Sequence, residues 1–111
     1  MNYRRKVRVW KRKLNRYIYW TIGLDEYQPA ITDDDTLQFS ILFTDKNNKL
    51  LYEGDIVKYD GINYEIKYLA TQAGYILHNQ GFNFITFSDL TGNELEWLGT
   101  SKESPELLWE D

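Results

Sequence analysis

The chain contains no cysteine, and His78 is its only histidine among 111 residues. The absence of cysteine excludes disulfides, thiol catalysis, zinc fingers and iron–sulfur ligation, and one histidine cannot build a histidine-rich metal site. The longest run of hydrophobic residues is Tyr17–Trp20, so the sequence predicts neither a membrane-spanning helix nor the apolar core of a signal peptide. We therefore expect a soluble, intracellular protein without a cofactor.

The residues that are present favour one small β-rich domain core. Leu, Ile, Val and Phe together number 30 of the 111 residues, which is above the level at which a charged chain stays disordered. Four Trp, nine Tyr and five Phe add large, rigid side chains that suit strands and contact surfaces. The length supports one core but not two.

The charge is unevenly distributed along the chain. Residues 1–16 hold eight cations and no acid, whereas residues 17–111 hold all 17 acids and five lysines, a balance of −12 that leaves the whole chain at −4. Such asymmetry suggests a basic segment that meets nucleic acid or an acidic surface, including that of its own or a neighbouring copy. The cations of this basic arm are Arg4, Arg5, Lys6, Arg8, Lys11, Arg12, Lys13 and Arg16.

The basic arm has the alternation of a β-hairpin. Residues 5–10 place Val7 and Val9 on one side, and residues 16–22 form a second strand after a turn at 11–15. The same residues also fit a basic amphipathic helix, because apolar side chains recur at helical spacing. The content of valine and aromatic residues favours the hairpin.

The remaining pattern predicts short strands joined by tight turns. An acidic loop covers residues 25–35, and the clearest turn is Asp60-Gly61, which suits a type I′ hairpin that pairs Tyr59 with Ile62 and Val57 with Tyr64. Residues 104–109 begin with a capping Ser and a Pro, which predicts a short helical turn. The predicted strands are 37–43, 56–59, 62–68, 74–78, 82–87 and 94–98, with 82–87 central because both of its faces are apolar.

Three stretches resemble the YopX family of small phage and prophage proteins. The first is Tyr52-Glu53-Gly54-Asp55 followed by Ile-Val-Lys, after the turn 45–49; the second is Leu98-Gly99 with the ending Ser104-Pro105-Glu106-Leu107-Leu108; the third is Lys6-Val7-Arg8-Val9-Trp10. The sequence departs from the family pattern in having Asn48 for a turn glycine, Ile41-Leu42 for a Thr-Gly pair, and Lys11 for an aspartate.

The resemblance implies an origin in a phage and a location in the cytoplasm of the bacterial host, but no activity. With the strand pattern, it predicts an all-β fold: a small, strongly bent SH3-like barrel with an N-terminal β-hairpin segment and a short C-terminal helical turn. We predict a basic β segment with its acidic loop at residues 1–36, and the barrel with its tail at 37–111.

Three groups of residues could be catalytic or metal-binding sites, but a structural role explains each of them better. Glu53-Gly54-Asp55 could be a carboxylate pair, but no partner group is tied to it by motif, so we interpret it as a loop in which Gly54 adopts an unusual backbone angle and Asp55 accepts backbone hydrogen bonds. The run 33–35 lacks the ligand spacing of an EF-hand and is interpreted as a solvated loop. His78 is interpreted as a strand residue.

The basic arm is the group of residues in this sequence that best fits a binding function. Its cations could contact phosphates while its aromatic residues stack on bases, or it could be an edge hairpin whose aromatic residues face inward. The candidate binding residues are Arg4, Arg5, Arg8, Trp10, Lys11, Arg12, Lys13, Arg16, Tyr17 and Tyr19.

The absence of any catalytic motif predicts a binding protein rather than an enzyme. We expect the acidic body to engage a host or phage protein, as an anti-defence or regulatory inhibitor would. The alternative is an accessory protein that binds nucleic acid through the arm. The opposite charges of arm and body would also permit a homo-oligomer.

Overall fold

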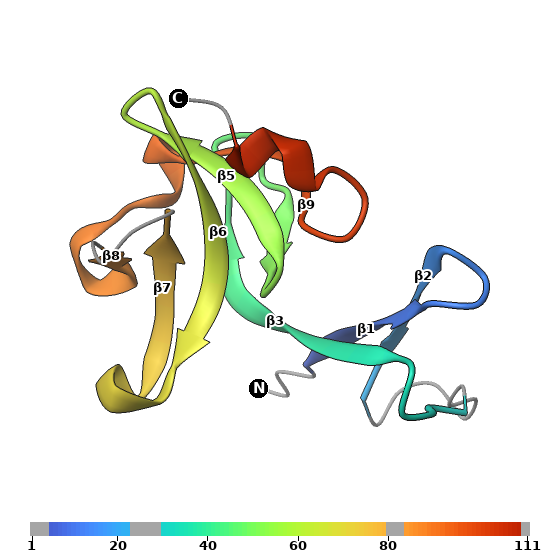
Figure 1. The fold of residues 1–111 in the computed structure, drawn as a ribbon. Helices are drawn as coiled ribbons and strands as arrows, with labels where there is room; N and C mark the ends of the chain where they lie inside the picture. Colours follow the sequence, from blue (N-terminus) through green and yellow to red (C-terminus); the bar gives the residue numbers. More distant parts are fainter. Residues whose placement is uncertain (1–4, 23–29, 80–83, 110–111) are drawn as a thin grey trace. The chain divides into compact units, whose positions relative to one another are not determined.

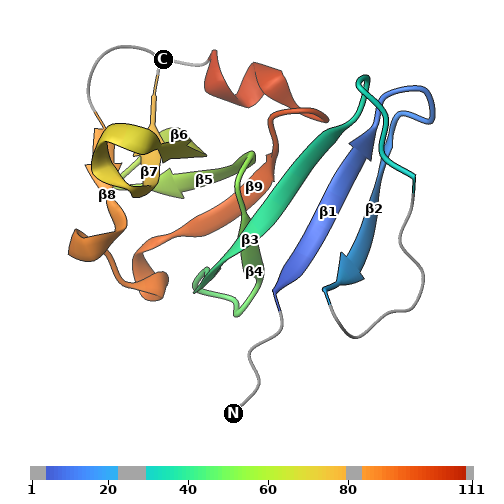
Figure 2. The same ribbon diagram turned by 90° about the horizontal axis from the view of Figure 1, so that it is seen from below.

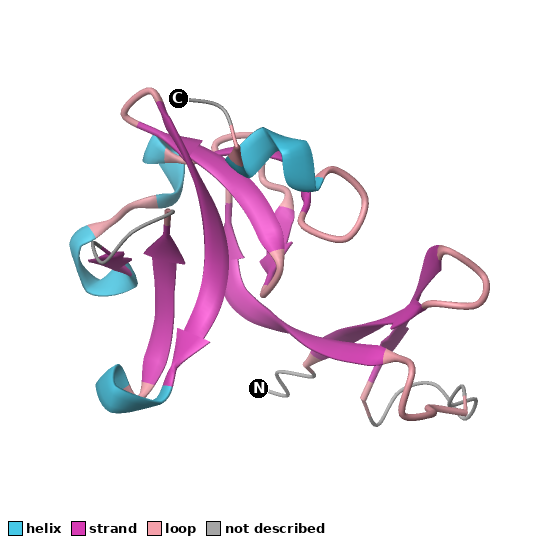
Figure 3. Cartoon of the chain, viewed as in Figure 1, coloured by secondary structure: helices cyan, strands magenta, loops and turns pink. Residues whose placement is uncertain are grey.

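The computed structural model describes residues 5–22, 30–79 and 84–109, and these residues are mainly β-structure (Figure 3). They divide into two compact units, Met1–Ser40 and Ile41–Asp111. None of the helices in this part of the chain is long and apolar enough to cross a membrane. The strands are β1 Lys6–Lys11, β2 Arg16–Thr21, β3 Thr36–Thr44, β4 Leu50–Tyr52, β5 Asp55–Tyr59, β6 Ile62–Leu69, β7 Gly74–His78, β8 Phe84–Thr86 and β9 Glu96–Thr100. The 3₁₀ helices are η1 Ala70–Gln72, η2 Phe87–Asp89, η3 Gly92–Glu94 and η4 Pro105–Leu108.

The first unit is built on the antiparallel hairpin of β1 and β2, with β3 on the other side of β1 (Figure 2). Val9 pairs with Ile18 on one side and with Leu37 on the other. β1 lies between β2 and β3 in its sheet, and its side chains are buried from Val7 to Trp10. Since successive side chains of a strand point to opposite faces, both faces of β1 are covered there. The predicted hairpin is confirmed, and the helical alternative is wrong.

The second unit holds a five-stranded antiparallel sheet in the order β8-β7-β6-β5-β9, which curls into a half-barrel (Figure 1). Asp60 and Gly61 have φ of 51° and 80°, as a type I′ turn requires. The turn fixes the register, and Tyr59 pairs with Ile62 and Val57 with Tyr64, as predicted. The predicted all-β class is therefore confirmed, and the small, strongly bent SH3-like barrel that was predicted corresponds to this curled half-barrel sheet.

The core of the second unit is one cluster of apolar side chains from the sheet, from β4 and from the connections around them. Half-buried aromatic side chains pack around its fully buried aliphatic centre, and Phe43 meets Phe87 edge to face with ring centroids 5.0 Å apart. Such packing contributes both apolar burial and ring–ring attraction. The buried centre consists of Leu51, Val57, Ile66, Leu77, Leu90 and Leu95.

Two predictions about local elements are wrong. The strand expected at 82–87 is not central, because β8 lies at the edge of its sheet and pairs only with β7 among the described strands. The chain leaves the strand at Phe87 and turns into η2, so this side chain packs in the core from a helical turn rather than from a strand. Ser104 does not cap η4 through its hydroxyl; its carbonyl oxygen accepts a hydrogen bond from the Leu107 N–H at 3.1 Å.

Leu42 interrupts the regular geometry of β3. It has φ of 59°, a left-handed conformation that costs about 1–2 kcal/mol for a residue with a Cβ atom. Its side chain is 66% exposed, so little burial offsets this strain. A glycine, which the resemblance stated above would place here, adopts such angles freely.

Candidate interaction surfaces

Arg8 in the basic arm is a core residue of the first unit. It is 2% exposed, its Nε donates a hydrogen bond to Gln38 Oε1 at 2.8 Å, and its guanidinium lies 4.2 Å from the centroid of the Tyr17 ring. The Tyr17 hydroxyl donates to the same Gln38 oxygen at 3.1 Å. A buried charge is tolerated only with such partners, so Arg8 stabilises the sheet and is not presented to a ligand.

Arg5 also bonds within the first unit. Its Nε donates to the Ser40 carbonyl oxygen at 3.1 Å, and its guanidinium lies over the Phe39 ring at 4.6 Å from the centroid. The contact joins the start of the hairpin to β3. One face of the Phe39 ring is thereby covered by a cation.

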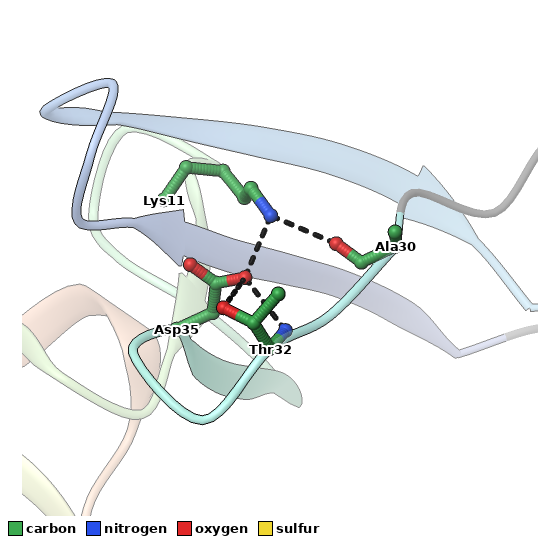
Figure 4. A network of polar contacts seen from close by, with 4 residues as sticks. All are labelled: Lys11, Ala30, Thr32 and Asp35. Atoms are coloured by element: carbon green, nitrogen blue, oxygen red, sulfur yellow. Dashed lines mark hydrogen bonds and ion pairs between the residues drawn. The ribbon is translucent and has the colours of Figure 1, made fainter.

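Lys11 holds the loop that precedes β3 (Figure 4). Its Nζ donates to Asp35 Oδ2 at 2.6 Å and to the Ala30 carbonyl oxygen at 2.8 Å. The same Asp35 oxygen accepts from the Thr32 N–H at 2.9 Å and from its hydroxyl at 3.2 Å. The Lys11 hydrogen bond, followed by that from the Thr32 N–H, outweighs desolvation and lowers the pKa of Asp35 to about 2.

The three aspartates of the run 33–35 therefore do not have the same role. Asp35 fixes the loop to β1, whereas Asp33 and Asp34 are exposed. Within the described ranges, no three acidic or histidine side chains gather closely enough to hold a metal ion.

The aromatic residues of the arm pack mainly on one another. Trp10 is 7% exposed and meets Tyr17 edge to face at 4.9 Å between centroids, and Tyr17 is 6.0 Å from Tyr19. Tyr19 is 55% exposed. Since Arg8 covers Tyr17 and Arg5 covers Phe39, these rings offer less free surface for stacking on bases than the sequence pattern suggested.

The exposed cations of the arm gather at the tip of the hairpin. Arg12, Lys13 and Arg16 are exposed there, with Leu14 53% exposed between them. The N–H groups of Leu14 and Asn15 both donate to the Lys11 carbonyl oxygen, at 3.0 and 2.8 Å, and Asn15 has φ of 54°. The turn therefore has a defined shape. Lys6 is also exposed, and Arg4 lies outside the described residues.

Glu53-Gly54-Asp55 forms a tight connection between β4 and β5. Gly54 has φ of 91°; its N–H donates to the Ile66 carbonyl and its own carbonyl accepts from the Ser101 N–H, both at 2.8 Å. Asp55 is 1% exposed and accepts the Tyr52 N–H at 2.8 Å. This geometry matches the structural interpretation of the loop, with Glu53 half-buried beside it.

Gly99 and Pro105 place η4 against β9. A Cβ atom on Gly99 would lie 3.2 Å from Leu107 Cδ1, a tight contact that would require the Leu107 side chain to move by a few tenths of an ångström. Pro105 is the first residue of that turn. His78 is half-buried in β7, opposite Glu65 and Phe84.

Asp45 is a structural residue that the sequence analysis missed. Its Oδ1 accepts the N–H groups of Asn47 and Lys49, each at 2.9 Å, and its Oδ2 accepts the Trp97 N–H at 3.0 Å. Burial raises the pKa of Asp45, but the three N–H donors and the charge of Lys49 outweigh it and lower the pKa. The signal was present, because an aspartate at the start of an Asp-Lys-Asn-Asn-Lys turn suits such bonds.

A family model described as YopX protein matches residues 21–109, which run from the end of β2 through η4. A search of curated proteins found no match.

Proposed function

The chain belongs to the YopX family, and we propose that it is a non-enzymatic protein of phage or prophage origin that binds a host or phage protein. The working surface is the acidic face of the second unit. A phage protein of this kind can inhibit a host factor by occupying a basic surface that normally meets nucleic acid.

The observation that supports this proposal is the difference in net charge between the two units. Residues 41–111 carry 12 acids and five lysines, a balance of −7, whereas residues 1–40 carry eight cations and five acids, a balance of +3. Arg5, Arg8 and Lys11 are engaged inside the first unit. A net negative charge of this size would steer association with a basic protein and make the association rate sensitive to salt.

The enzyme alternative would depend on Glu53 and Asp55. Asp55 is buried and accepts a backbone N–H, an arrangement that serves the turn. A folded Glu53→Gln variant that lost a measurable turnover of the wild type would support the enzyme alternative against our proposal.

Nucleic-acid binding is the second candidate, and the exposed tip favours it. Arg12, Lys13 and Arg16 could contact phosphates, and Tyr19 is exposed on the same hairpin. Such binding would fall steeply as salt rises, by a slope set by the number of phosphates contacted.

One experiment separates the two candidates. A tagged protein is used to capture partners from host lysate, with and without nuclease, as wild type and as two variants. The acid variant carries Asp60→Asn, Glu94→Gln and Glu106→Gln; the tip variant carries Arg12→Ser, Lys13→Ser and Arg16→Ser. All six positions are exposed, and the conservative amides keep the turn at Asp60 and the Glu94 oxygen that accepts the Thr91 N–H.

We expect a partner that survives nuclease, is lost with the acid variant and is kept by the tip variant. A nuclease-sensitive association that is lost with the tip variant would reject the proposal in favour of nucleic acid. Circular dichroism of both variants ensures that a loss reflects the surface and not the fold.

A further inference from the structure

Two turns of opposite charge lie close together in the first unit. The hairpin tip, residues 12–16, exposes three cations around Leu14, which is 53% exposed. The acidic turn, residues 31–34, exposes two aspartates after Ile31, which is 48% exposed. Each turn therefore combines charge of one sign with an exposed aliphatic side chain. The charged residues are Arg12, Lys13 and Arg16 in the hairpin tip, and Asp33 and Asp34 in the acidic turn.

Lys11 fixes the position of the two turns relative to each other. Its carbonyl oxygen accepts the N–H groups of Leu14 and Asn15 in the hairpin tip, at 3.0 and 2.8 Å. Its Nζ donates to Asp35 Oδ2 at 2.6 Å (Figure 4), and the Asp35 N–H closes the acidic turn by donating to the Thr32 carbonyl oxygen at 3.0 Å. Both turns are therefore preformed, and preformed turns lose little conformational entropy on binding.

The charges of the two turns are not used within the described part of the chain. Among the described residues, the charged groups of the hairpin tip and of the acidic turn form neither an ion pair nor a side-chain hydrogen bond. Lys11 and Asp35, which lie between the two turns, are paired with each other. The hairpin tip thus offers a charge of +3, and the acidic turn a charge of −2, to an external partner.

We propose that the hairpin tip of one copy binds the acidic turn of a second copy, and that the second copy returns the same contact to form a two-fold dimer. Leu14 of each copy packs against Ile31 of the other, and the three cations of the hairpin tip face the two aspartates of the acidic turn. A reciprocal contact of this kind closes the assembly at two copies. Both turns belong to the first unit, so the contact depends on the geometry of that unit alone.

The composition of the two turns favours a second copy over a nucleic acid as the partner. Phosphates would attract the cations of the hairpin tip but repel Asp33 and Asp34 beside them, and residues 12–16 contain no aromatic ring on which a base could stack. A second copy of the same surface offers acids to the cations and an apolar side chain to Leu14. The surface is small, and interfaces below about 1,200 Å² form weak, transient complexes, so we expect a dimer that dissociates on dilution.

Sedimentation velocity on the purified protein tests the proposal. At low salt the wild type is expected to form dimers as its concentration rises, and high salt should weaken them, because interactions between exposed charges are screened beyond about 8 Å at physiological salt. Leu14→Ala should raise the dimer dissociation constant by about tenfold, because the apolar contact is reduced at both places where the two copies meet.

Charge reversal gives the sharper test. The tip-reversed protein carries Arg12→Glu, Lys13→Glu and Arg16→Glu. The turn-reversed protein carries Asp33→Lys and Asp34→Lys. Each should be a monomer by itself, because like charges then face one another in both contacts. Mixing the two proteins should restore association, because both contacts again join opposite charges. The turn-reversed chain has a formal net charge of zero, since its two substitutions add four charges to −4, so general attraction between the proteins would not explain the association.

The matched control carries Lys46→Glu, Lys67→Glu and Lys102→Glu. It reverses three exposed cations of the second unit, with the same change in net charge as in the tip-reversed protein, and should leave the dimer intact.

A wild type that stays monomeric at low salt would overturn the proposal, and so would a dimer that survives reversal of either turn. Failure of the mixed reversed proteins to associate, when each is folded by circular dichroism, would also overturn it. A monomeric wild type whose hairpin tip binds an oligonucleotide would assign the tip to nucleic acid instead. Self-association is measured on the purified protein alone, so its absence leaves the proposed binding of a host or phage protein unaffected.

Discussion

Replacing Asp45 should destabilise the second unit far more than its place in a surface turn suggests. Asp45 is 4% exposed, and its carboxylate accepts three backbone N–H groups, two within its own turn and one from Trp97 in β9. The bond to Trp97 joins the turn between β3 and β4 to the edge of the five-stranded sheet. Loss of this carboxylate therefore affects both a turn and a strand.

The magnitude follows from the number of donors left without an acceptor. A hydrogen bond to a charged group contributes about 1.5–3 kcal/mol, and a buried donor without a partner costs about 1–3 kcal/mol. Because the three bonds share one carboxylate, their energies are not additive, and Asp45→Ala should cost about 3–5 kcal/mol. Asp45→Asn keeps one oxygen but turns an NH₂ group toward an N–H donor, and should cost about 2 kcal/mol.

Urea denaturation followed by far-UV circular dichroism measures this loss. For a small protein the dependence of stability on urea is about 1–3 kcal/mol per molar, so Asp45→Asn should lower the midpoint by about 1–2 M. Asp60→Asn is the matched control, because it removes an equal charge from an exposed turn position where Asn-Gly is as well suited as Asp-Gly.

The pH dependence provides a second readout of the same contact. The pKa of Asp45 is lowered in the folded protein, so its carboxylate stabilises the fold above the pKa of the unfolded chain, and this contribution is lost as pH falls through the folded value. The Asn variant should lack that part of the acid sensitivity. An Asp45→Asn protein within about 0.5 kcal/mol of the wild type, the range expected for surface substitutions, would refute the reasoning.

Three further changes test other parts of the structure. Leu42→Gly should stabilise the protein by about 0.5–1 kcal/mol, because relief of the left-handed strain outweighs the entropy cost of glycine; a lower urea midpoint would contradict this. Asp35→Asn should remove stability that the wild type keeps above about pH 4 and loses as pH falls towards 2, because the Lys11 hydrogen bond is what lowers the pKa of Asp35; unchanged acid titrations of the two proteins would count against the contact. Arg8→Lys should cost about 1–3 kcal/mol in urea denaturation, because an ammonium group cannot reproduce both the stacking and the bond to Gln38; a neutral substitution would show that Arg8 is not a core residue.

Local chemistry made the hairpins predictable. In the β5–β6 hairpin, Asp60-Gly61 determines the turn type, the turn type determines the register, and alternation then places Val57 and Ile66 in the core. In the β1–β2 hairpin, the apolar residues also fit a helical spacing, but valine and aromatic residues at alternate positions favour strands, and strands form. Both predictions depended on residues within one short stretch of chain.

The contacts that escaped prediction join residues far apart in sequence. Asp45 bonds the Trp97 N–H across 52 positions, and Arg8 bonds Gln38 across 30. The position of β8 at a sheet edge depends likewise on the order in which strands pair, whereas its apolar composition suits a central strand. Periodicity contains no information about such pairings, so these features required the fold.

The basic arm shows how a count of charges differs from the charge that a surface presents. The sequence gives the arm eight cations, yet the hairpin places Arg8 between Gln38 and Tyr17 and bonds Lys11 to Asp35. A side chain with such partners must break its hydrogen bonds and ring contacts before it can contact a phosphate. The free energy lost in breaking them weakens the binding. Among the described residues of the arm, the exposed cations therefore lie mainly at the hairpin tip, where a partner of either kind, protein or nucleic acid, would meet Arg12, Lys13 and Arg16 before any other cation of the arm except Lys6.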